Sequence, residues 1–227
     1  MPRFFADISG STATISGRDV KHITGPLRKR SGDEILIRNG TEGFKAKITS
    51  ITKNEISLEI IESQVLCNRG NTRLNLGISL IDIREMDDAI RFTAELGVES
   101  ICPVIAERSN IRSISQAKLT RWEDIIKEAL KQSQRRTLPI LESPVTLPEF
   151  TKSSLSFRNR YYASIDGDTS ILKIKDEEIC FLIGPEGGFT DNETGLFKEC
   201  GYIPVNMGKT TLRTLAAAIA AASILCI

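Results

Sequence analysis

The sequence of 227 residues predicts a two-part α/β protein, with a small β module over residues 1–70 and an α/β domain over residues 71–227. Three observations lead to this prediction. Short alternating segments separated by turn residues make up the first part. Strand-like and helix-like segments alternate through the second, which is typical of a mostly parallel sheet covered on both faces. Within it, the wholly apolar pentad 179–183 suits a strand buried on both faces.

The β module is predicted from apolar and polar residues that alternate with a period of two. Segments 34–38, 44–48 and 55–60 show this alternation, and an Asn39-Gly40 turn separates the first two. These features predict short antiparallel strands in a half-solvated sheet or barrel. A polar stretch, residues 67–73, is the expected linker to the second part.

The α/β domain is predicted from hydrophobic periodicity. We expect strands at 74–81, 101–105, 138–141, 161–165, 179–183 and 203–207, and helices at 85–96, around 119–130, after Thr190 and at 215–227. Gly97 supplies a C-terminal stop for the first helix. Thr190 and Glu193 have the spacing of a capping box, which begins another helix.

Composition excludes several classes of protein. The 30 basic and 29 acidic residues give a formal charge of +1, so any RNA surface must be a local patch. The five cysteines have no metal-ligand spacing and there is one histidine, so we expect no metal site and reduced thiols. The longest apolar run, residues 215–227, is too short to cross a bilayer and no signal-peptide pattern is present. We therefore expect a cytoplasmic protein with no membrane partner.

Two short runs near the end of the chain predict a ligand-binding cradle. The first, Ile183–Thr190, has the sequence IGPEGGFT and directly follows the apolar pentad. The second, Met207–Thr214, has the sequence MGKTTLRT and follows another predicted strand. Glycines remove side-chain bulk, so that backbone groups can approach a ligand closely at the carboxyl ends of these strands. Neither run is a phosphate-binding G-x-G-x-x-G or Walker loop, which disfavours a nucleotide-dependent oxidoreductase or kinase.

Together the two runs resemble the cofactor site of the SPOUT RNA methyltransferases, and within them the RsmE family. Further matches follow in the same order: Met1–Phe5, His22 with Leu27-Arg28, Gly32-Asp33, Glu95–Val98, Glu107–Ser109 and Gln132-Ser133 with Arg135. The resemblance spans nearly the whole chain, and the order of its motifs is more specific than any one of them.

The resemblance implies a fold, a cofactor and a substrate. It implies a PUA-like RNA-binding barrel followed by a SPOUT domain with a C-terminal trefoil knot, assembled as a homodimer. It implies methylation of uridine N3 in small-subunit (16S) ribosomal RNA, with S-adenosylmethionine as methyl donor. The cofactor-binding residues that it implies are Leu182, Gly184, Pro185, Glu186, Gly187, Gly188, Met207, Gly208 and Leu212.

Arg213 and Glu95 are the candidate catalytic residues. Arg213 suits stabilisation of negative charge on the uracil carbonyl oxygens or fixing of a phosphate, and a structural salt bridge is the alternative. Glu95, just before Gly97, is the weaker candidate because a glutamate in a last helical turn is more often solvated. Glu186 suits either a cofactor contact or a cap.

Candidate RNA-binding residues are mostly basic. Arg28, Lys29 and Arg30 form three consecutive cations that suit phosphate contacts, with a solvated basic loop as the alternative. The full set is Arg3, His22, Arg28, Lys29, Arg30 and Arg135.

The sequence also departs from the family pattern. Thr210, Leu215 and Ala216 stand where the second motif usually has an arginine, a glutamate and a threonine, and Phe92 replaces a common lysine. The cofactor glycines are kept. A second hypothesis is therefore a catalytically weakened RNA-binding or ribosome-assembly factor, which methyl-transfer assays would distinguish from an active enzyme.

Overall fold

The computed structural model describes residues 2–40, 42–64, 72–133 and 137–226, with the side chains of 132 and 133 excepted. The chain divides into two compact units. Unit 1 comprises Met1–Asn68 with Leu130–Leu138, and unit 2 comprises Arg69–Ala129 with Pro139–Ile227.

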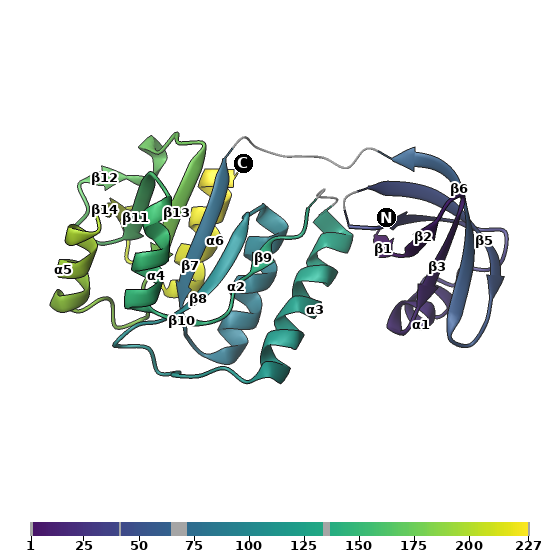
Figure 1. The fold of residues 1–227 in the computed structure, drawn as a ribbon, viewed down its shortest axis with the longest axis horizontal. Helices are drawn as coiled ribbons and strands as arrows, with labels where there is room; N and C mark the ends of the chain where they lie inside the picture. Colours follow the sequence, from purple (N-terminus) through teal and green to yellow (C-terminus); the bar gives the residue numbers. More distant parts are fainter. Residues whose placement is uncertain (1, 41, 65–71, 134–136, 227) are drawn as a thin grey trace. The chain divides into compact units, whose positions relative to one another are not determined.

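Unit 1 is a curled six-stranded sheet with the strand order β1-β4-β5-β6-β3-β2 (Figure 1). The strands are β1 (Arg3–Phe5), β2 (Asp7–Ser9), β3 (Thr12–Ser16), β4 (Glu34–Arg38), β5 (Gly43–Ile51) and β6 (Glu55–Gln64). Its strands pair antiparallel, apart from the parallel pair β1 and β4. The predicted segments 34–38, 44–48 and 55–60 are therefore confirmed as antiparallel neighbours.

Alternation along these strands places their apolar side chains in one core. Ile35 and Ile37 of β4 are buried, and so are Ile56 and Leu58 of β6. The short helix α1 (Arg18–Thr24) contributes its own buried residues to the same core. Because one face of the sheet is filled in this way, the other face and the connecting loops carry the polar residues.

Unit 2 is built on a parallel sheet with the strand order β10-β8-β7-β13-β11-β14-β12, and β9 pairs beside β8. The strands are β7 (Arg73–Ser79), β8 (Ser100–Ile105), β9 (Ile140–Leu141), β10 (Val145–Thr146), β11 (Asn159–Ala163), β12 (Thr169–Ser170), β13 (Glu178–Ile183) and β14 (Ile203–Asn206). All of these pairings are parallel, so the strands end at one edge of the sheet.

Helices cover both faces of this sheet (Figure 1). They are α2 (Ile83–Leu96), α3 (Gln116–Ser133), α4 (Leu147–Ser153), α5 (Asp191–Glu199) and α6 (Thr214–Cys226), with 3-10 turns at Ser154–Ser156 and Ile171–Lys173. α2 packs against α6, which also contacts β7 and β13, whereas α4 and α5 pack together. The α/β class predicted from alternating elements is confirmed.

Local signals explain several element boundaries. The capping box of α5 is present, because the Thr190 side chain accepts from the Glu193 N–H and the Glu193 carboxylate accepts from the Thr190 N–H. Gly97 closes α2 in the left-handed conformation at φ 119°. The strand predicted at 161–165 is displaced: β11 runs from Asn159 to Ala163, and Ser164 already belongs to the loop that follows.

Candidate functional site

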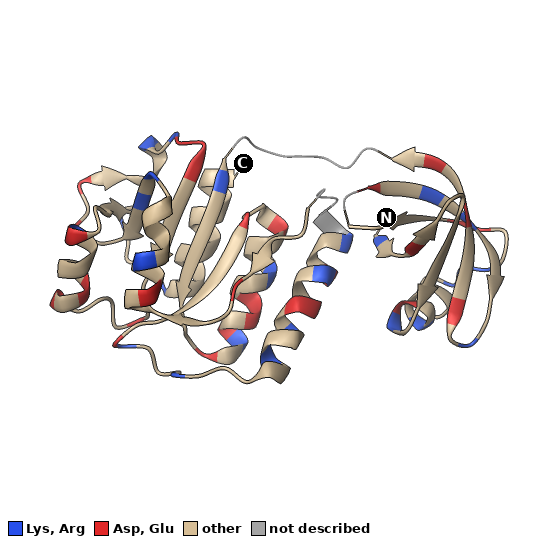
Figure 2. Cartoon of the chain, in the orientation of Figure 1, with Lys and Arg blue, Asp and Glu red and all other residues tan. Residues whose placement is uncertain are grey.

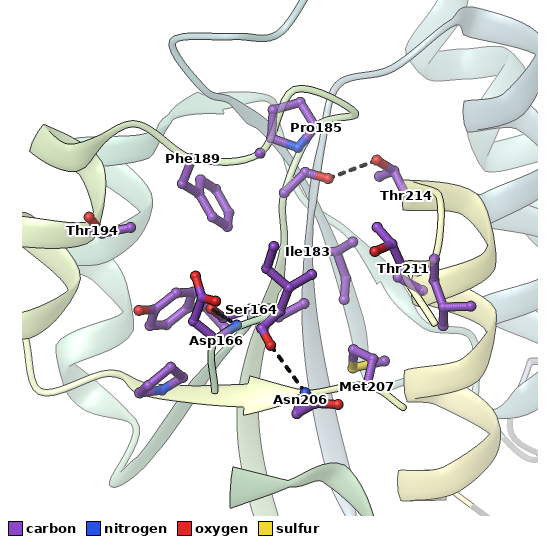
Figure 3. Close-up of a pocket in the computed structure, with 18 of the residues that line it drawn as sticks. Ser164, Asp166, Ile183, Pro185, Phe189, Thr194, Asn206, Met207, Thr211 and Thr214 are labelled. Atoms are coloured by element: carbon purple, nitrogen blue, oxygen red, sulfur yellow. Dashed lines mark hydrogen bonds between the residues drawn. The ribbon is translucent and has the colours of Figure 1, made fainter. Parts of the chain in front are cut away.

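A pocket of about 1040 Å³ lies at the carboxyl ends of β11, β13 and β14. Three loops that follow these strands form its walls: 164–166, 184–189 and 207–213. Figure 3 shows Phe189 and Thr194 on one side of the hollow and Met207, Thr211 and Thr214 on the other. Parallel strands bring these loops to one edge of the sheet, the usual place for a ligand in an open α/β sheet.

The loop after β13 is held by its carbonyl groups. The Thr214 hydroxyl donates to the Gly184 carbonyl at 2.8 Å (Figure 3). The Gly188 N–H donates to the Pro185 carbonyl at 2.9 Å, and Gly188 has φ 67°. A Cβ on Gly184 would lie 2.9 Å from the Phe189 ring, so the loop folds closely over itself. The glycines are therefore required by the path of the backbone.

The same loop leaves hydrogen-bond donors unused. Within the described residues, the backbone N–H groups of Glu186, Gly187 and Phe189 have no hydrogen-bond partner. Glu186 and Gly187 are exposed and Phe189 is half-buried, so water can reach these donors and a ligand that carries acceptor atoms can take its place. Both the carboxylate and the adenine ring of an adenosyl amino acid carry such acceptors.

The loop after β14 has few internal bonds. The Gly208 N–H donates to the Asn206 side chain at 2.8 Å. The N–H groups of residues 209–212 have no partner among the described residues. Arg213 is exposed, lines the pocket, and its guanidinium has no carboxylate partner within the described chain. The salt bridge considered for Arg213 is thus not formed there, and its charge faces the pocket region unneutralised.

A third loop, 164–167, was not among the sequence predictions. The Asn206 side chain donates to the Ile165 carbonyl at 3.2 Å, which ties this loop to β14 (Figure 3). A Cβ on Gly167 would lie 2.8 Å from the backbone of residues 205 and 206, so only glycine allows this approach. The sequence did contain a signal, because Ser164, Asp166 and Gly167 follow a strand and predict a turn. That pattern does not indicate that the turn lines a pocket.

Tyr162 precedes this loop and also lines the pocket. Burial, and then the nearby Asp166 carboxylate, raise the pKa of the Tyr162 phenol above its usual value. Its hydroxyl therefore stays protonated at neutral pH. Tyr162 thus contributes an aromatic ring and a protonated hydroxyl to this wall.

Most of the predicted cofactor residues are brought together here. Those that line the pocket are Gly184, Pro185, Glu186, Gly187, Gly188, Met207, Gly208 and Leu212. Leu182 does not line it, because its side chain packs in the core cluster that contains Phe150 and Phe197, and its neighbour Ile183 lines the pocket instead. Glu95 lies in the last turn of α2 and is not among the lining residues.

The predicted RNA-binding residues that can be located lie in unit 1. Arg28 and Arg30 are exposed and Lys29 is half-buried, and no described carboxylate pairs with their side chains. His22 lies in α1, where its ring packs edge-on against Phe4. Arg135 lies outside the described residues.

Arg3 behaves differently from the other predicted cations. It lies in β1 and is 5% exposed, beside the fully buried Arg38. Burial, and then the Arg3 charge, lower the pKa of Arg38 to about 10. Arg3 is thus less accessible to a phosphate than the loop at 28–30.

Two classes of site are not found. Among the described residues, no cluster of His, Cys, Asp and Glu has the arrangement that a metal ion requires. Within the same part of the chain, none of the helices has the length and apolar character needed to cross a membrane. Acidic and basic residues are interspersed in both units (Figure 2).

Comparison with known proteins identifies both parts of the chain. A family model described as an RNA methyltransferase domain matches residues 68–226, and one described as an RNA methyltransferase PUA domain matches residues 15–61. The ribosomal RNA small subunit methyltransferase E of Rickettsia conorii is 30% identical, with 91% of this chain and 85% of that protein covered. That of Aquifex aeolicus is 29% identical, with 95% and 94% covered.

Solved structures agree with the sequence matches. Ribosomal RNA small subunit methyltransferase E from Neisseria gonorrhoeae, bound to S-adenosyl methionine, has a TM-score of 0.89 at 30% identity, covering 98% of this chain and 95% of that one. A putative methyltransferase from Legionella pneumophila, with bound cofactor SAM, has a TM-score of 0.90 at 26% identity, covering 98% and 96%.

The fold and these matches define an RNA methyltransferase with an N-terminal PUA domain. The chain belongs to the ribosomal RNA small subunit methyltransferase E family. The resemblance noted in the sequence is therefore confirmed, whereas the trefoil knot and the homodimer stay predictions.

Proposed function

We propose that this protein uses S-adenosylmethionine to methylate N3 of a uridine in 16S ribosomal RNA. The observation that carries the proposal is the pocket at the ends of β13 and β14, where unmet backbone N–H groups and the unpaired Arg213 occur together. The relatives named above support the class of reaction and of RNA. The choice of base and ring atom rests on the family resemblance.

The pocket residues fit an adenosyl amino acid. The N–H groups of Glu186, Gly187 and Phe189 would hold its acceptor atoms, and Ile183, Met207 and Leu212 supply apolar contact for its adenosine. When bound, S-adenosylmethionine would supply the methyl group: N3, after losing its proton to solvent, would form the N3–C bond as the C–S bond breaks and leaves its electron pair on sulfur.

Arg213 has a separate role in this proposal. Loss of the N3 proton places negative charge on the uracil carbonyl oxygens, and an unpaired guanidinium at the pocket stabilises that charge. Alignment of the reacting atoms by the three loops contributes as well, so no covalent enzyme intermediate is needed. The exposed cations of unit 1 would position the RNA through its phosphates.

The first test is calorimetric titration of the protein with S-adenosylmethionine, followed by methyl transfer to small ribosomal subunits that lack the modification. Binding with transfer to uridine N3 supports the proposal. Binding without transfer to any small-subunit RNA would favour the weakened RNA-binding factor, with Thr210, Leu215 and Phe92 as the relevant departures. Absence of binding would contradict the cofactor assignment.

Arg213→Ala tests the mechanism. We expect methyl transfer to slow by about 10²–10³-fold while cofactor affinity is retained, as for removal of a charge-stabilising donor. Arg158→Ala, which removes an exposed arginine away from the pocket, is the matched control. An unchanged rate in Arg213→Ala would remove this residue from the chemistry.

A further inference from the structure

Arg108 reaches the glycine-rich loop from a different part of the sheet. It follows β8, which is separated from β13 by β7 in the strand order. Its Nη1 donates to the Gly187 carbonyl at 2.6 Å and also lies 3.4 Å from the Phe189 carbonyl. Arg108 is exposed and lines the pocket. A charged donor therefore holds two carbonyls of the loop from outside it.

The contact depends on the absence of a side chain at position 187. A Cβ on Gly187 would lie 3.3 Å from the Arg108 Cδ and 3.4 Å from its Cβ. Those separations are tighter than most contacts of a real Cβ. The arginine stem thus lies directly against the loop backbone, and the glycine leaves room for it.

A second bond joins the same two loops. The buried Glu193 carboxylate accepts the Glu107 N–H at 2.7 Å on one oxygen and the Thr190 N–H at 2.9 Å on the other. The segment 187–193 is therefore tied to the loop after β8 at both of its ends.

These bonds fix the two peptide units on either side of the Phe189 N–H. In the first unit, Arg108 holds the Gly187 carbonyl while the Gly188 N–H bonds to the Pro185 carbonyl. In the second, Arg108 contacts the Phe189 carbonyl while the Thr190 N–H bonds to Glu193. Because each peptide unit is planar, fixing both of its ends fixes its orientation. The peptide between them, which carries the unmet Phe189 N–H, is therefore oriented in advance.

We propose that Arg108 is a positioning residue for cofactor binding, which orients the backbone donors of loop 184–189 by holding its carbonyls. This inference rests on the proposed function, because it assigns the loop donors to S-adenosylmethionine. Arg108 acts through the loop backbone. It should therefore govern affinity for the cofactor more than the rate of the methyl-transfer step.

Three variants test this role in the full-length protein. Arg108→Ala should raise both the Kd and the KM for S-adenosylmethionine about tenfold, with kcat changed less than about twofold. Arg108→Lys keeps a cation that reaches one carbonyl at most, so its Kd should fall between those of the wild type and Arg108→Ala. Arg112→Ala is the matched control, because Arg112 donates to the Ala106 and Glu107 carbonyls of its own loop and does not touch loop 184–189.

The outcomes separate this inference from the proposed function. A wild-type protein that does not bind S-adenosylmethionine contradicts both. Binding by the wild type with equal Kd values in Arg108→Ala and Arg112→Ala overturns the inference alone. A fall in kcat at unchanged Kd and KM also overturns it, since that would place Arg108 in the chemical step. Should Arg108→Ala not fold, a wild-type Kd in a folded Arg108→Lys protein would likewise count against it.

Discussion

At the scale of single residues, Glu193 does more than its capping box requires. Its carboxylate closes the box of α5 with one oxygen and ties the loop after β8 with the other, and the side chain is 5% exposed. The Thr146 and Glu149 capping box of α4 has the same local chemistry, but Glu149 is exposed and, among the described residues, bonds only to Thr146. The same capping-box motif should therefore contribute more to the free energy of unfolding at Glu193, which is buried, than at Glu149, which is exposed.

The two glutamates give a matched prediction. Glu193→Gln places an amide donor where both neighbours are N–H donors, so one donor loses its acceptor in a buried site. We expect a loss of about 1–3 kcal/mol in the free energy of unfolding, measured by urea denaturation. Glu149→Gln should cost distinctly less because water can replace the lost bond. Equal losses in the two variants would contradict the role given to burial.

Cys180 gives a prediction for alkaline pH. It is 1% exposed in β13, and burial raises the pKa of its thiol from 9.0 to about 12. Between those two values the unfolded thiol is ionised while the folded thiol stays protonated. Stability is therefore lost as pH rises above about 9.

Urea denaturation at pH 8 and pH 10 measures this loss. The wild type should lose about 1 kcal/mol more than Cys180→Ala over that interval, because the variant lacks the titrating group. The cavity created by the substitution affects both pH values alike. An identical pH dependence in the two proteins would show that the Cys180 thiol titrates normally in the fold.

Individual residues also show where sequence reasoning ends. The glycines of loop 184–188 were identifiable because three of them within five positions indicate a backbone path that side chains would obstruct. Leu182 and Ile183 were not separable, because neighbouring residues of a strand buried on both faces are both apolar while pointing to opposite sides. Arg108 lies in the matched segment Glu107–Ser109, but its role could not be predicted, since its partner carbonyls lie 79 and 81 positions further along the chain.

At the scale of elements, α4 packs closely on the sheet because the strand beneath it has a glycine, and so no side chain, at the point of contact. Gly77 lies in β7, and a Cβ added there would lie 2.5 Å from the Phe150 ring of α4 and 3.0 Å from Leu182. Phe150 belongs to the core that this face of the sheet shares with α5. The helix can approach the strand only because the strand carries glycine at that point.

Gly77→Ala should therefore destabilise unit 2 by about 1–3 kcal/mol through overpacking, as measured by chemical denaturation. Adding Phe150→Leu, which removes ring atoms from the contact, should recover part of that loss. Two losses that simply add would contradict the contact, because independent sites are additive and touching ones are not.

The elements themselves were predictable where their signals were local. Long periodic helices and apolar strands, such as α2 and β13, appeared at the expected positions. The strand predicted at 138–141 is confirmed over its last two residues as β9, whereas the two-residue strands β10 and β12 were not predicted, since so short a pairing depends on its neighbours in the sheet. The parallel pairing of β1 with β4 joins segments some thirty residues apart, and no local pattern specifies it.

At the scale of the whole molecule, the net charge is close to zero, so attraction to RNA must depend on where the cations lie. The triple variant of Arg28, Lys29 and Arg30 to alanine should weaken RNA binding and reduce its log–log salt slope by roughly 2–3. A control triple of Lys152, Arg158 and Lys173 removes three exposed cations from unit 2. Each triple changes the formal charge from +1 to −2, so the two remove the same charge from different places.

Filter binding to small-subunit RNA across a range of salt concentrations measures both slopes. The loop at 28–30 has the phosphate-contacting role if its triple lowers the slope while the control does not. Equal effects would mean that net charge alone governs affinity, and the loop would then be a solvated basic segment.

Because hydrogen bonds to its carbonyls hold loop 184–189 in place, the positions of this site differ in how far they can change in sequence. Its free donors belong to the main chain, so every amino acid except proline supplies them equally. Glu186→Ala would therefore leave these donors in place, whereas Phe189 is also needed for its ring, which packs against Tyr162 and Phe197. The positions under constraint are those that hold the loop from outside, Arg108 and Thr214, and those whose bulk would deform it, Gly184 and Gly187.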